Sequence, residues 1–94
     1  KLLINTRRKP NEFSFSKTFK VATVDATAIA LHHEILVGGI PVVNTPILGA
    51  VPRILNQVTL SSIQKIITKK WKTDLAKRNV AATQEAFEQT EVNF

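Results

Sequence analysis

Only two segments of this 94-residue chain have the pattern of β-strands, and that scarcity limits the folds open to it. Leu2-Leu3-Ile4 is a short apolar run that ends at the turn-former Asn5, and the segment from Phe19 to Val24 is rich in β-prone residues. Both show little polar alternation, as strands of a parallel sheet covered on both faces do. Two strands joined by an irregular crossover do not form a stable sheet alone. We therefore expect this chain to complete the edge of a larger α/β sheet supplied by other polypeptide.

Two helix starts follow the second strand. Asp25 is typical of an N-cap, and the helical spacing of apolar residues after it predicts a helix that Gly38-Gly39 ends. Thr45 is the predicted cap of the next helix, with Pro46 at a position where a missing N–H is harmless. Pro52 then keeps this helix short or kinks it.

Two further helices complete the pattern. Thr59 is the predicted cap of the first, whose apolar stripe includes Ile67 and Trp71, and the second runs from about residue 74 to residue 89. Residues 6–18, between the strands, are polar and mixed, which predicts a loop. The fold class is therefore α/β: two strands and about four helices from a three-layer α/β/α domain with a mainly parallel sheet.

Composition excludes several kinds of chemistry. The chain has no Cys, which excludes disulfides, thiolate metal sites and cysteine nucleophiles. Its formal net charge is +6, with basic residues clustered at 7–9 and along 65–78. A solvated face, an acidic protein and a phosphate-bearing ligand each account for this charge. Nucleic acid is disfavoured as a partner, because aromatic residues make up only 6% of the chain and do not interleave with the basic ones.

The chain carries no Met, even at position 1, and begins abruptly on a strand-like run, so we expect a segment of a longer gene product. The apolar run at 2–4 is too short for a secretory leader. The most apolar stretch, residues 35–55, is broken by glycines, prolines and an arginine, whereas a membrane span needs roughly 18 uninterrupted apolar residues. We therefore expect a cytoplasmic location and no membrane partner.

Asp25 and the pair His32-His33 are the first candidates for chemistry, and each has a simpler role. Asp25 has no second carboxylate close to it in sequence, so helix capping accounts for it. Neighbouring residues on a helix point about 100° apart and do not converge on one ion, so no metal site is predicted at the histidines. We expect His33 at the edge of the core and His32 in solvent. No nucleophile elbow or glycine-rich phosphate loop is present, so no catalytic residue is predicted.

Asn44-Thr45 is the candidate binding site. The pair stands at a predicted helix N-terminus, where free amides favour an anion. Two interpretations remain open: simple capping with packing of Gly49 against a neighbour, or a contribution to a phosphate-bearing ligand such as coenzyme A. Arg53 and Lys65 are the basic residues expected to assist such binding.

Two motifs, in this order and spacing, resemble a known family. Val24-Asp25-Ala26-Thr27-Ala28-Ile29-Ala30 and Asn44-Thr45-Pro46-Ile47-Leu48-Gly49-Ala50 are similar to motifs of the gamma domain of the 2-oxoacid:ferredoxin oxidoreductases. The segment 37–43 is similar to pyruvate-type members. Further similar segments, within a resemblance that covers about residues 1 to 90, are Leu2-Leu3-Ile4-Asn5, Val58-Thr59-Leu60-Ser61-Ser62-Ile63, Asn79 and 82–87. Pro52 departs from the family's pattern, and its glycine-rich first strand and helix have no counterpart.

The resemblance implies that residues 1–94 are the C-terminal half of an oxidoreductase gamma domain, with the upstream half missing. Members of the family oxidatively decarboxylate pyruvate or a related 2-oxoacid to an acyl-coenzyme A. They use thiamine diphosphate and pass electrons through iron–sulfur clusters to ferredoxin. Those cofactors lie in other domains or subunits.

This chain is therefore implied to be a non-catalytic part of the enzyme that binds no cofactor alone, with Asn44 and Thr45 as coenzyme A contacts. The implied partners are other subunits or domains of the same hetero-oligomeric oxidoreductase and, indirectly, ferredoxin. The alternative function is a stand-alone basic binding module for an acidic protein or nucleic acid.

Overall fold

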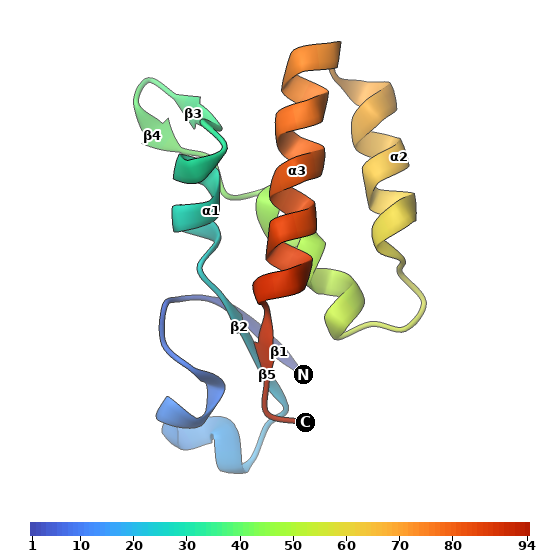
Figure 1. Ribbon diagram of the computed structural model, residues 1–94. Coiled ribbons are helices and arrows are strands. Elements are labelled where there is room, and N and C mark those ends of the chain that lie inside the picture. Colours follow the sequence, from blue (N-terminus) through green and yellow to red (C-terminus); the bar gives the residue numbers. More distant parts are fainter.

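The computed structural model describes residues 1–94, and its main sheet has three strands in the order β1-β2-β5 (Figure 1). β1 (Leu2–Asn5) lies parallel to β2 (Val21–Val24), so both predicted strands are confirmed. β5 (Glu91–Val92) pairs antiparallel with the other side of β2 and was not predicted. The α/β class is confirmed, with one parallel and one antiparallel strand pair in this chain.

β2 is the centre of the sheet, and all four of its residues are buried. Successive strand residues point to opposite faces, so both faces of the sheet are covered here. The 3-10 helix η3 (Pro46–Arg53) packs against β1 and β2, and the short 3-10 helix η1 (Pro10–Glu12) also contacts β2. β1, in contrast, is only partly buried and has no strand partner on its outer edge within this chain.

The predicted loop at 6–18 contains two short 3-10 helices, η1 and η2 (Ser14–Lys17). The Glu12 carboxylate accepts the Lys9 backbone N–H at 2.6 Å, which fixes the first turn of η1. The rings of Phe13 and Phe15 stack with their centroids 5.1 Å apart. This crossover is therefore ordered by local contacts even though its sequence has no helical periodicity.

α1 (Ala26–His32) begins as predicted, because the Asp25 carboxylate accepts the Ala28 N–H at 3.0 Å. The side-chain amide of Asn5 donates to the Thr27 hydroxyl at 3.0 Å and so ties the end of β1 to the start of this helix. The capping role of Asp25 is confirmed.

The prediction that Gly38-Gly39 ends α1 is wrong. The pair forms the tight turn between two short strands, β3 (Leu36–Val37) and β4 (Ile40–Pro41). Their φ angles of 58° and 80° are left-handed values that glycine adopts at little cost. The helix stops earlier because Glu34, with φ 55°, already has left-handed backbone.

η3 is a 3-10 helix with Pro46 at its start and Pro52 inside it, so Pro52 shapes this segment as predicted. The prediction that Thr45 caps it through its side chain is wrong. A capping residue needs extended backbone angles, and Thr45 has helical ones, φ −86° and ψ −46°.

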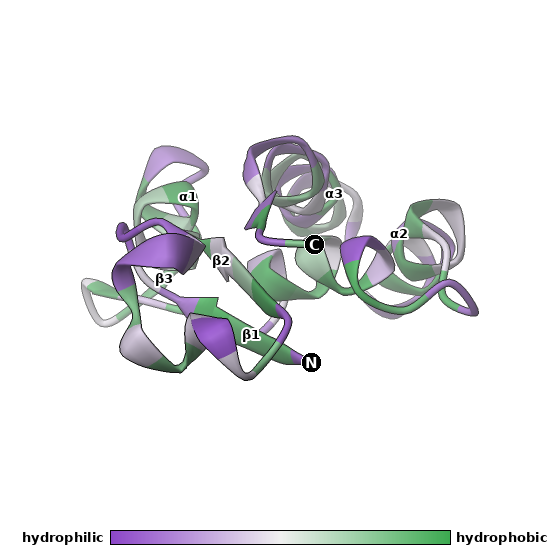
Figure 2. Ribbon diagram, turned by 90° about the horizontal axis from the view of Figure 1, so that it is seen from below, coloured by the Kyte–Doolittle hydropathy of each residue, from purple (hydrophilic) through white to green (hydrophobic).

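α2 (Leu60–Lys70) and α3 (Thr73–Gln89) confirm the last two predicted helices. The Thr59 hydroxyl accepts the Ser62 N–H at 3.1 Å, which is the predicted cap. Figure 2, viewed from below Figure 1, shows α1, α3 and α2 side by side, and both outer helices pack against α3.

The core lies where α1, η3 and α3 meet, and it is built mostly from small side chains. Gly49 packs against the backbone of Thr83, where an added Cβ would lie 2.7 Å from the Thr83 Cα. Its buried cluster consists of Val24, Ile29, Ala30, Ile35, Ala50, Ala82 and Ala86. Close approach of η3 and α3 is therefore what holds the helical side of the fold together.

Burial in this chain is limited. Only 19 of 94 residues are buried, while Val37, Ile40 and Ile66 are each more than 60% exposed. The chain is also thin, with extents of 42 × 31 × 16 Å. Exposed apolar side chains of this size, together with the open edge of β1, favour coverage by further polypeptide.

Candidate functional site

Asn44 and Thr45 lie at the rim of a groove between the start of η3 and one face of α2. The groove has a volume of about 380 Å³, within the range of small-molecule sites. Its lining residues are Val42, Asn44, Thr45, Leu48, Ile63, Ile66, Ile67, Lys70 and Trp71. The predicted pair is thus brought to a real concavity, with an apolar floor and a polar rim.

Lys70 supplies the positive charge of this groove, and sequence reasoning missed it. Ile63, Ile66 and Lys70 are spaced three and four residues apart, so they share one face of α2. That spacing was the available signal. The Lys70 Nζ lies 5.4 Å from the centre of the Trp71 ring, at the end of the groove where α2 stops.

The two basic residues that sequence analysis expected here lie elsewhere. Arg53 donates to the Phe87 carbonyl oxygen at 2.8 Å and sits over the ring of the same residue. Lys65 lines a different hollow on α2. Neither residue lines the groove, so the expected assistance from Arg53 and Lys65 is wrong.

The expected free amides are also largely absent at the start of η3. Pro46 has no N–H, and the amides of Ile47 and Leu48 donate to the carbonyl oxygens of Val43 and Thr45, at 3.1 and 3.0 Å. An anion in this groove would therefore be held by side chains. The Thr45 hydroxyl is available, since it makes no capping hydrogen bond, and Lys70 contributes charge.

A larger hollow of about 520 Å³ lies between α2 and α3. It shares Trp71 with the groove, and Lys77 is its one charged lining residue. It contains neither Asn44 nor Thr45, so the smaller groove is the better candidate for ligand binding.

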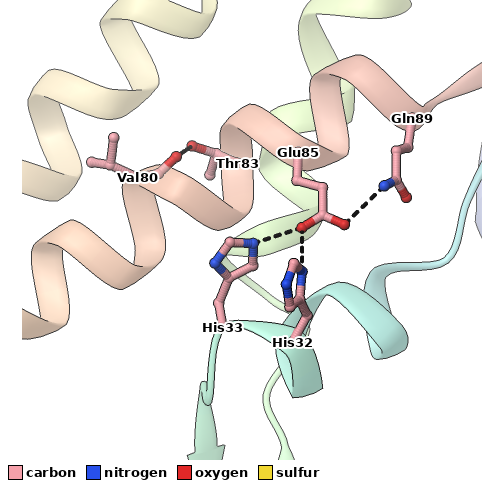
Figure 3. A network of polar contacts seen from close by, with 6 residues as sticks. All are labelled: His32, His33, Val80, Thr83, Glu85 and Gln89. Atoms are coloured by element: carbon pink, nitrogen blue, oxygen red, sulfur yellow. Dashed lines mark hydrogen bonds and ion pairs between the residues drawn. The ribbon is translucent and has the colours of Figure 1, made fainter.

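A second polar cluster joins α1 to α3 (Figure 3). His32 Nδ1 and His33 Nε2 lie 2.8 and 2.7 Å from the same oxygen, Glu85 Oε1. The expectation that these neighbours cannot converge is wrong. His33 has φ −96° and ψ 10° beyond the last residue of α1, so helical geometry does not separate the two rings. Their exposures are as predicted: the side chain of His32 is 70% exposed and that of His33 is 19% exposed.

The electrostatics of this cluster favour a charged Glu85. Burial raises the pKa of its carboxyl, but the hydrogen bonds and charge of His32 and His33 outweigh burial and leave the pKa below its ordinary value. The Gln89 side-chain amide donates to the second oxygen, Oε2, at 2.8 Å. Glu85 is thus an oriented carboxylate with two imidazoles on one oxygen.

Comparison with known proteins identifies the family. The profile described as "Pyruvate ferredoxin/flavodoxin oxidoreductase" matches residues 1–89. The chain belongs to this family. The resemblance seen in the sequence motifs is therefore confirmed.

Two curated relatives of this family member are informative. The chain is 40% identical, over 94 residues, to the pyruvate/ketoisovalerate oxidoreductases common subunit gamma of Pyrococcus furiosus, covering 97% of this chain and 49% of that protein. It is 36% identical, over 69 residues, to the pyruvate synthase subunit PorC of Methanocaldococcus jannaschii, covering 73% of this chain and 36% of that protein. The chain spans about half the length of the gamma relative.

The fold agrees with these matches. The crystal structure of the pyruvate oxidoreductase subunit PORC from Thermotoga maritima superposes on 99% of this chain and 52% of its own, with a TM-score of 0.78 and 32% identity. None of the helices here is both long enough and apolar enough to cross a membrane.

Within this family member, the motif Asn44–Ala50 has a clear structural meaning. Ala50 is fully buried, and Gly49 allows η3 to touch the backbone of α3. The expected packing of Gly49 against a neighbour is therefore confirmed. The first two residues of the motif, in contrast, face the groove.

Proposed function

We propose that this chain is the non-catalytic gamma part of a 2-oxoacid:ferredoxin oxidoreductase, which oxidatively decarboxylates pyruvate or a related 2-oxoacid to an acyl-coenzyme A. The observation that carries the proposal is the family match over residues 1–89, supported by a similar fold in a pyruvate oxidoreductase subunit. In the whole enzyme, thiamine diphosphate and iron–sulfur clusters perform the chemistry and ferredoxin takes the electrons. The cytoplasm is the proposed location.

The choice of oxoacid belongs to other subunits in this proposal. The Pyrococcus furiosus relative is named as a gamma subunit common to pyruvate and ketoisovalerate oxidoreductases. A subunit shared by two enzymes does not by itself decide between their substrates. Pyruvate remains the first substrate to test, because the relatives with the other name are called pyruvate synthase subunits.

Residues 1–94 are proposed to be the C-terminal half of a gamma domain. The open edge of β1 and the exposed Val37 and Ile40 provide surfaces for the rest of that domain or for neighbouring subunits. The partners proposed are therefore the other subunits or domains of the same oxidoreductase.

The groove beside Asn44 and Thr45 is proposed to contact coenzyme A. Coenzyme A has a flexible, largely uncharged arm and several phosphates. The groove offers an apolar floor for the former and Lys70 for the latter. Asn44, Thr45 and Lys70 are the proposed contacts.

The first test is purification of the complex through an affinity tag on this chain. We expect it to carry thiamine- and cluster-bearing subunits and to reduce ferredoxin when pyruvate and coenzyme A are both supplied. Activity that survives in a complex lacking this chain would contradict the proposal. A chain that purifies alone and binds polyanions, with affinity falling steeply as salt rises, would instead support the stand-alone basic module.

The second test addresses the groove. We expect Lys70→Ala to raise the KM for coenzyme A about tenfold, the usual scale for losing one charged hydrogen bond, with kcat for saturating substrate unchanged. Lys69→Ala removes the neighbouring lysine, which does not line the groove, and serves as the matched control. Equal KM values for the two variants would exclude the groove as a coenzyme A contact.

A further inference from the structure

His32, His33 and Glu85 bring three metal-binding side chains to one point between α1 and α3 (Figure 3). Their donor atoms, one from each residue, lie within 4.8 Å of one another. They come from positions more than fifty residues apart in sequence. We propose that this cluster binds one divalent transition-metal ion of the Zn²⁺ type.

The geometry needs only small adjustments to hold such an ion. Zn–N and Zn–O bonds of about 2.0–2.2 Å place neighbouring donors of a tetrahedron about 3.3 Å apart. The two N···O distances, 2.8 and 2.7 Å, would open slightly, and the two nitrogens would approach each other. The His32 side chain is 70% exposed and free to make that movement.

The donor chemistry selects the kind of ion. Two imidazole nitrogens and one carboxylate oxygen suit Zn²⁺ and related ions, whereas Ca²⁺ and Mg²⁺ prefer sites built from oxygens. The carboxylate is charged in the folded protein, and Gln89 orients it through Oε2, as supporting hydrogen bonds do around metal ligands. A water molecule would complete a three-residue site of this kind.

The rest of the chain offers little competition for such an ion. It has two histidines and no cysteine, so every nitrogen or sulfur side chain that Zn²⁺ favours is in this one cluster. The ion would join the C-terminal end of α1 to the middle of α3 across the small-residue core. Its role is therefore structural, and it does not depend on the proposed enzyme function.

The experiment is a titration of the full, chelator-treated chain with Zn²⁺ by calorimetry, repeated with Co²⁺ as an optical probe of the ligand field. We expect one ion per chain and visible Co²⁺ bands of a tetrahedral site. His33→Gln and Glu85→Gln should weaken binding at least tenfold. Glu88→Gln, which changes another glutamate on α3, is the matched control and should leave the affinity unchanged.

His32→Gln decides the matter even if the more buried variants fold poorly, because the His32 side chain is mostly in solvent. Weaker Zn²⁺ binding by this variant, with an unchanged circular dichroism spectrum, supports the site. The proposal is overturned if the natural chain binds Zn²⁺ no more tightly than His32→Gln does. It is overturned equally if Glu88→Gln weakens binding as much as Glu85→Gln.

Discussion

Replacing Gly49 with alanine should loosen the contact between η3 and α3, and the structure sets the size of the effect. The new Cβ would lie 2.7 Å from both the Cα and the carbonyl carbon of Thr83, and its nearest neighbour would be the Thr83 carbonyl oxygen. Ordinary contact begins at 3.4 Å, so the two backbones would have to separate by about 0.7 Å or more. Neither side can relieve this by a change of rotamer, because the atoms it meets belong to a helix backbone.

The free-energy estimate combines two opposing terms. Overpacking of a tight core costs about 1–3 kcal/mol, and a backbone-to-backbone clash belongs at the upper end. Alanine recovers up to about 1 kcal/mol, since it loses less conformational entropy on folding than glycine does. The expected net loss of stability is about 2 kcal/mol.

Hydrogen exchange of the α3 amides in the purified subunit measures this loss where it occurs. For amides that exchange through unfolding of the α3–η3 contact, about 2 kcal/mol corresponds to roughly 30-fold faster exchange. Gly38→Asn is the control: nothing lies within 4 Å of that position, and asparagine tolerates its positive φ. Exchange in Gly49→Ala at the rate of the natural protein would refute the close approach of the two helices.

The remaining predictions are simpler. Thr59→Ala removes the cap of α2 and should cost about 1 kcal/mol in urea unfolding, whereas Ser61→Ala, one turn position away, should be nearly neutral. Because the pKa of Glu85 is lower in the folded chain than its ordinary 4.5, its contribution to stability is complete above that value. That contribution should disappear as the pH falls through the folded pKa, and Glu85→Gln should flatten this acid limb of the stability curve. Residues 1–94 expressed alone should melt over a broad temperature range, in contrast with the same residues in the assembled enzyme.

Much of the helical structure was predictable because its signals are local. Asp25 and Thr59 cap the helices that follow them, as their side-chain chemistry and the apolar spacing after them indicate. The end of α1 was not predictable from Gly38-Gly39, since a glycine pair fits a hairpin turn as well as a helix end. The choice between them was made by the left-handed backbone of Glu34.

The features missed in the site depend on contacts between distant segments. β5 has two residues and no apolar run, and only its pairing with β2 makes it a strand. The meeting of His32 and His33 on Glu85 follows from the packing of α1 on α3, which no sequence spacing encodes. Lys70, however, was within reach, because its position on the face of α2 follows from helical periodicity.

The outer side of β1 carries a physical consequence for the life of the chain. Alternate backbone N–H and C=O groups of Leu2–Asn5 face away from β2, and no strand of this chain receives them. Such a row is a template for any extended peptide, including a second molecule of the same kind. During synthesis, this polypeptide should therefore be most prone to aggregate in the interval before its neighbour docks, and co-expression with that neighbour is the natural route to soluble material.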